Sequence, residues 1–106
     1  MAIAEVLTYR PRPGGTEQFI ALAKRADKIL RGLGATTRTL NTVVGGPSSN
    51  GFVYVIETPN WKAHGEFSAK LENDPDWKKF VAEVNSMDKP SADLVSSALY
   101  SEIPLG

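Results

Sequence analysis

The chain has 106 residues, 42% of them hydrophobic and 23% charged, which predicts one globular domain over residues 1–106. Twelve Lys and Arg balance twelve Asp and Glu, and the zero net charge argues against nucleic-acid binding. Cysteine is absent, which excludes disulfides and thiol chemistry, and no metal or cofactor is expected. Apolar runs such as Phe52–Ile56 are too short to span a membrane, and Met1–Glu5 has no signal-peptide pattern. We therefore expect a soluble cytoplasmic protein that does not contact a membrane.

Seven elements are predicted in chain order from propensity, periodicity and turn residues. β-branched and aromatic residues indicate strands, and apolar residues spaced three and four apart indicate helices. Asp74 followed by Pro75 suits a helix start, so the second helical stretch is predicted in two pieces. The predicted strands are 3–10, 36–44, 52–57 and 94–103, the predicted helices are 17–33, 60–73 and 75–86, and 45–51 is a predicted loop.

The order β-α-β-β-α-β predicts an α+β ferredoxin-like fold, in which a four-stranded antiparallel sheet carries its helices on one face. Both alternating sets of strand residues are largely apolar, as Tyr54 and Ile56 against Val53 and Val55 show. An apolar second face is expected to meet a partner rather than water. The sequence therefore predicts a homodimer that packs through the open sheet face.

Charge is distributed unevenly along the chain. Residues 1–53 carry seven basic and three acidic side chains, whereas residues 54–106 carry five basic and nine acidic ones. Two copies in an antiparallel arrangement would place unlike charges together, although scatter over a solvated surface explains the same pattern.

Two short motifs resemble a known family. Glu5–Tyr9 reads E-V-L-T-Y and is followed by Arg12-Pro13-Gly14, which resembles the E-L-R-T-Y and K-P-G opening of NIPSNAP-like proteins of the dimeric α+β barrel superfamily. The segment Asp74–Trp77 is similar to the D-P-x-W segment of that group. The resemblance implies a ferredoxin-like dimer. It leaves function open, because the superfamily includes cofactor-free oxygenases, isomerases, haem-binding or haem-degrading proteins and regulatory ligand-binding domains.

His64 is the only histidine and is the candidate catalytic residue. It shares a predicted helical face with Phe67 and Leu71, so its ring is expected to point towards the sheet. A single imidazole can act as a general base or as an axial haem ligand, and it can equally be a structural residue with a backbone partner. If a ligand site exists, we expect it near His64, between the first part of the second helix and the sheet.

Tyrosines and a tryptophan complete the predicted ligand site. Tyr9, Tyr54 and Tyr100 lie on three different predicted strands, and phenols that converge on a cleft could orient a substrate. The predicted ligand-binding residues are Tyr9, Tyr54, Trp61, His64 and Phe67. Glu5 and Arg38 are charges within strands, and we expect them to pair with each other or to lie each at a sheet edge; a charge that orients a substrate is the alternative.

Three functions remain open from the sequence. The first is an uncharacterised homodimer that binds a small apolar or aromatic molecule between sheet and helices. The second is a cofactor-independent monooxygenase or isomerase of aromatic or polyketide-like substrates, with His64 as the base. The third is a haem-binding or haem-degrading protein with His64 as the iron ligand.

Overall fold

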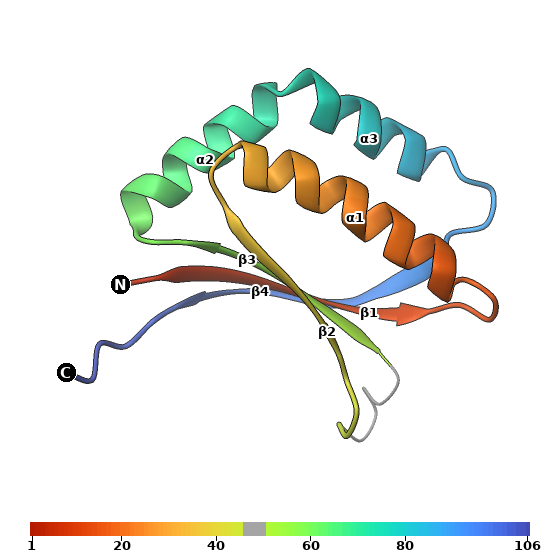
Figure 1. Ribbon diagram of the computed structural model, residues 1–106, viewed down its shortest axis with the longest axis horizontal. Coiled ribbons are helices and arrows are strands. Elements are labelled where there is room, and N and C mark those ends of the chain that lie inside the picture. The colour runs from red at the N-terminus through yellow and green to blue at the C-terminus, as the bar shows by residue number, and fades with distance from the viewer. Residues whose placement is uncertain (46–50) are drawn as a thin grey trace.

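The structure is a computed structural model that describes residues 1–45 and 51–106. The described elements are β1 (Ile3–Pro11), α1 (Thr16–Gly32), β2 (Thr36–Asn41), β3 (Phe52–Thr58), α2 (Trp61–Asn73), α3 (Pro75–Asn85) and β4 (Ala92–Ser101). The four strands form one antiparallel sheet in the order β2-β3-β1-β4, and the helices lie on one face of it (Figure 1). This confirms the ferredoxin-like α+β fold.

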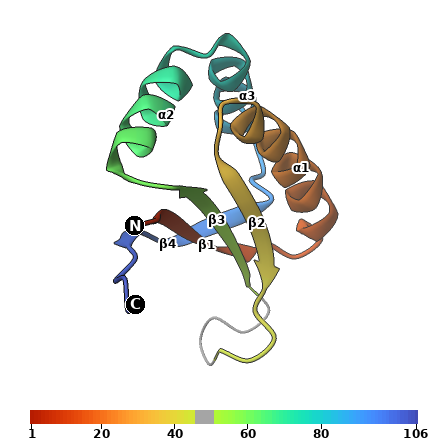
Figure 2. The same cartoon turned by 60° about the vertical axis from the view of Figure 1, so that its left-hand side comes forward.

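Local sequence explains where α2 and α3 begin. The Asn60 side chain accepts from the Ala63 amide at the start of α2, and the Asp74 side chain accepts from the Trp77 amide at the start of α3. Figure 2 shows the break between α2 and α3 as a change of direction. The predicted break at Asp74–Pro75 is therefore confirmed.

Most element boundaries differ from the prediction by one to three residues. Thr16 is the first residue of α1 rather than its cap, because Gly15 holds the cap position without a side-chain hydrogen bond. β2 ends at Asn41, three residues earlier than expected, since Val43 and Val44 are exposed and unpaired with β3. The predicted loop 45–51 falls mostly outside the described residues.

Sheet register divides the strand residues into two faces. Leu7 lies opposite Tyr54 and Glu5 opposite Ile56, so these side chains share the face beneath the helices. Val6 lies opposite Val55, which places both on the open face. Tyr100 pairs with Ala4 and shares that open face.

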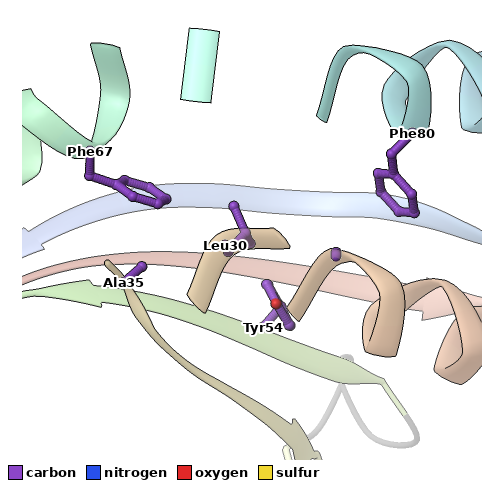
Figure 3. Packing of buried hydrophobic residues seen from close by; sticks show 6 residues of the cluster. Leu30, Ala35, Tyr54, Phe67 and Phe80 are labelled. Carbon is purple, nitrogen blue, oxygen red and sulfur yellow. The ribbon is translucent and has the colours of Figure 1, made fainter. Parts of the chain in front are cut away.

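The hydrophobic core fills the space between this sheet face and the helices. Its buried members are Ala26, Leu30, Ala35, Tyr54, Phe67 and Phe80. Figure 3 shows Phe67 and Phe80 pointing down from the helical layer towards the sheet at two separate places. No helix among the described residues is long and apolar enough to cross a membrane.

Candidate functional site

A cavity of about 280 Å³ lies between the sheet, α1 and α3. This volume is close to the lower end of the roughly 300–1,000 Å³ that small-molecule sites occupy. The sheet supplies Glu5, Leu7, Tyr9, Tyr54, Ile56 and Ala92; the helices supply Phe19, Leu22, Ala23, Ala26, Leu30, Leu71, Trp77, Phe80 and Val84; and Met87, Pro90 and Ser91 come from the α3–β4 connection. The lining is thus mostly apolar, with a few polar groups on the sheet side.

Helical periodicity brings the α1 and α3 residues to the cavity. Phe19, Ala23, Ala26 and Leu30 recur every three or four residues on α1. On α3, Trp77 and Phe80 are three residues apart, with ring centroids 5.6 Å from each other. Aromatic and aliphatic side chains of α1 and α3 therefore form the wall of the cavity opposite the sheet.

A polar network beside the cavity fixes Tyr54. The Arg31 guanidinium pairs with Asp27 at 2.9 Å and donates to the Thr37 hydroxyl, also at 2.9 Å. The Thr37 hydroxyl donates to Asp27, and the Tyr54 hydroxyl lies 3.4 Å from the same carboxylate. The network links α1 to β2 and β3. It directs the Tyr54 hydroxyl towards Asp27 while the ring remains at the cavity wall.

Both cavity tyrosines keep their protons well above neutral pH. Burial, followed by the negative charge of Asp27, raises the pKa of Tyr54 to about 12. Burial also raises the pKa of Tyr9, and the Glu5 charge adds to that effect. The Tyr9 hydroxyl makes no hydrogen bond to residues 1–45 or 51–106. It is therefore a phenol that a bound molecule could engage.

Tyr9 is held in place by aromatic packing. Its ring lies 5.1 Å from that of Phe19, which in turn stacks on Phe52 at 5.0 Å. These contacts join β1 to the first turns of α1. They hold the Tyr9 ring against one wall of the cavity.

The structure separates the other three predicted site residues from this cavity. Phe67 is 5% exposed and belongs to the core, whereas Trp61 is 53% exposed. His64 is half-buried, and its ring meets the edge of Trp61 at 5.8 Å. None of the three lines the cavity. The buried Phe67 ring fills the space beneath α2, so the open space lies under α1 and α3 instead of near His64.

Two further sequence expectations are corrected. Glu5 and Arg38 do not pair, because Glu5 faces the helices while Arg38 lies opposite Val55 on the open face, two strands away. Tyr100 does not converge with Tyr9 and Tyr54, since it lies on the open face. Both expectations needed the strand order and the face of each residue, and the sequence does not show which alternate set of strand residues meets the helices.

The sequence offered Glu5 only as an alternative substrate-orienting charge, and Trp77 and Phe80 were missed as cavity residues. Glu5 alternates with Leu7 and Tyr9 along one strand, which places all three on the same face of the sheet. Trp77 and Phe80 lie on a regular apolar helical stripe, and such a stripe does not distinguish core from cavity wall.

The element order and the strand order define a ferredoxin-like α+β protein. An uncharacterised NIPSNAP domain protein from Burkholderia xenovorans has the same fold, with a TM-score of 0.70, 17% identity and coverage of 98% of this chain and 97% of that chain. A NIPSNAP family protein from Agrobacterium tumefaciens matches with a TM-score of 0.66 at 19% identity, over 98% of this chain and 93% of that one.

An enzyme is also among the similar structures. SnoaB, a cofactor-independent oxygenase from Streptomyces nogalater, matches with a TM-score of 0.65 and 12% identity over 95% of this chain and 92% of its own. No family model and no curated protein matches the sequence. At these identities the likeness establishes the fold, and function must be argued from the site.

Proposed function

We propose that this protein binds a small apolar or aromatic molecule in the cavity between the sheet and α1 and α3. The observation that supports this most is the cavity itself, with its apolar walls and the phenols of Tyr9 and Tyr54. An apolar recess with a few polar groups is the usual form of a small-molecule site. The proposal retains Tyr9 and Tyr54 from the predicted site and does not use Trp61, His64 or Phe67.

Equilibrium dialysis against a panel of one-ring and two-ring aromatic compounds tests this function. We expect binding that weakens when Trp77→Ala removes part of the cavity wall. His64→Ala is the matched control, because His64 lies outside the cavity lining and its removal should leave affinity unchanged. Loss of binding in His64→Ala with normal binding in Trp77→Ala would contradict the proposed location.

We further propose that two copies pack through the open sheet faces. The centre of this face is apolar and includes Val6, Val53 and Val55, and Leu40 at its edge is 45% exposed. Tyr100, also on this face, is 56% exposed. In a twofold dimer the open face of one chain packs against the same face of the other chain. Stable interfaces of this type bury about 2,000 Å² or more.

Light scattering of the parent and of Tyr100→Lys tests this association, because Tyr100 is exposed on the open face whereas Val55 is buried within the chain. The parent should have twice the 11.5 kDa chain mass, and the variant should approach the mass of one chain. Ala21→Lys on the exposed side of α1 is the comparison for added charge. A parent that scatters as a single chain at micromolar concentration would contradict the dimer.

A second candidate function is cofactor-independent oxygenation or isomerisation of an aromatic substrate. It is supported by the fold likeness to SnoaB and by a carboxylate and a phenol lining one cavity. Glu5 would be the base in this case and Tyr9 an orienting donor. Oxygen-electrode measurements with polyphenolic substrates test it, with Glu5→Gln as the variant expected to lose turnover.

A further inference from the structure

The cavity carries charge of one sign. Among the described residues that line it, Glu5 is the single charged one, and no Lys, Arg or His reaches the lining. A carboxylate or phosphate on a ligand would therefore face an acidic group without any cation to compensate it. Electrostatics at this site disfavours anionic ligands and favours cationic ones.

Glu5 has no partner within the described part of the chain. Its neighbours across the sheet are Ile56 and Leu99, which cannot hydrogen-bond through their side chains. Its carboxylate forms no hydrogen bond or ion pair with residues 1–45 or 51–106. Glu5 is half-buried and lines the cavity wall, so a molecule in the cavity can reach its carboxylate without displacing a protein partner.

The cavity walls are rich in aromatic rings. The rings come from Tyr9, Phe19, Tyr54, Trp77 and Phe80. Aromatic faces attract cations, and ammonium groups are recognised in proteins by such rings. The Arg25 guanidinium lies 5.1 Å from the centroid of the Phe80 ring, but it pairs with Glu83 and does not line the cavity. Aromatic walls and a free carboxylate are complementary to the same kind of ligand group.

We infer that the ligand is a protonated amine with an apolar body. The ammonium group pairs with the Glu5 carboxylate, and the apolar body packs against the aromatic walls and the aliphatic side chains of α1. The inference rests on the proposed function, since it names the chemical class of the molecule bound in the same cavity.

Three probes that share a phenyl ring and a three-carbon chain test the charge preference. They are 3-phenylpropylamine, which is cationic at neutral pH, the neutral 3-phenylpropan-1-ol and the anionic 3-phenylpropionate. Isothermal titration calorimetry of the full chain measures each affinity. We expect the amine to bind about tenfold tighter than the alcohol, and the carboxylate about tenfold weaker, because a charge-assisted hydrogen bond replaces a neutral or repulsive contact.

Glu5→Gln should bring the amine to within about threefold of the alcohol, because the amide keeps the shape and loses the charge. Glu5→Asp retains the charge and should retain the preference. Glu57→Gln is the matched control, since Glu57 is a half-buried strand glutamate on the opposite face of the same sheet. Circular dichroism verifies that each variant is folded.

The possible results separate this inference from the proposed function. If the amine binds most tightly, and this preference is lost in Glu5→Gln and kept in Glu57→Gln, the result supports the amine inference and the proposed function. Equal binding of the three probes, or a preference that survives Glu5→Gln, overturns the amine inference while small-molecule binding stands. Failure of all three probes to bind overturns the proposed function, and the amine inference with it.

Discussion

Filling the cavity should stabilise the protein and block binding. Ala26 lies on α1, lines the cavity and is 9% exposed, so a larger side chain at this position extends into the cavity. The cavity volume is about 280 Å³. We expect Ala26→Leu to place its three added carbons there without displacing its neighbours.

The gain in stability follows from the area removed from water. Three buried carbons at about 0.8 kcal/mol each stabilise by about 2.4 kcal/mol. Fixing the leucine rotamer costs about 0.5–1 kcal/mol, and Ala and Leu differ little in helix propensity. We therefore expect the free energy of unfolding to rise by about 1.5 kcal/mol.

Urea denaturation measures the change, and dialysis with 3-phenylpropan-1-ol measures the loss of binding. Ala21→Leu is the control, because Ala21 lies on the exposed side of α1 and its replacement should stay within about 0.5 kcal/mol of the parent. A loss of about 1–3 kcal/mol in Ala26→Leu would indicate overpacking. That result would refute the reasoning, because it would mean that no usable space exists beneath α1.

Three further predictions follow from the same structure. Trp77→Ala should lower the free energy of unfolding by about 3 kcal/mol, the lower end for aromatic deletions, because Trp77 is half-buried; chemical denaturation checks it. The raised pKa of Tyr54 stabilises the folded state below pH 10, and at most about 2.7 kcal/mol of the free energy of unfolding is lost as pH rises towards 12. Urea titrations at each pH should show a smaller loss in Tyr54→Phe. Gly15→Ala should cost about 1–3 kcal/mol by thermal unfolding, because the added Cβ would lie 2.2 Å from the Ser91 carbonyl oxygen; a neutral effect would refute that close approach.

The secondary structure was predictable from local signals. Asp74-Pro75 marks a helix start by chemistry that acts within one turn, and the structure places a capped helix there. The repeat of Phe19, Ala26 and Leu30 on α1 likewise needed no tertiary information. The predicted length of β2 was too great, because β-branched residues favour a strand whereas pairing with β3 decides where the strand ends.

The site was less predictable because it depends on packing in three dimensions. Tyr9 and Tyr54 were predicted as phenols on different strands, and the register brings both to the sheet face beneath the helices. His64 was misplaced relative to the cavity since the sequence does not show that Phe67 fills the space beneath α2. The isolation of Glu5 could be recognised only once register had put Arg38 on the other face.

Tryptophan fluorescence tests the central claim most directly, because the chain has two tryptophans in different environments. Trp77 lines the cavity, whereas Trp61 is exposed and outside it. In Trp61→Phe, titration with 3-phenylpropylamine should change the emission of Trp77 in a saturable manner. In Trp77→Phe, the emission of Trp61 should stay constant over the same concentrations. A saturable response from Trp61 alone, or from neither tryptophan, would contradict a ligand site beneath α1 and α3.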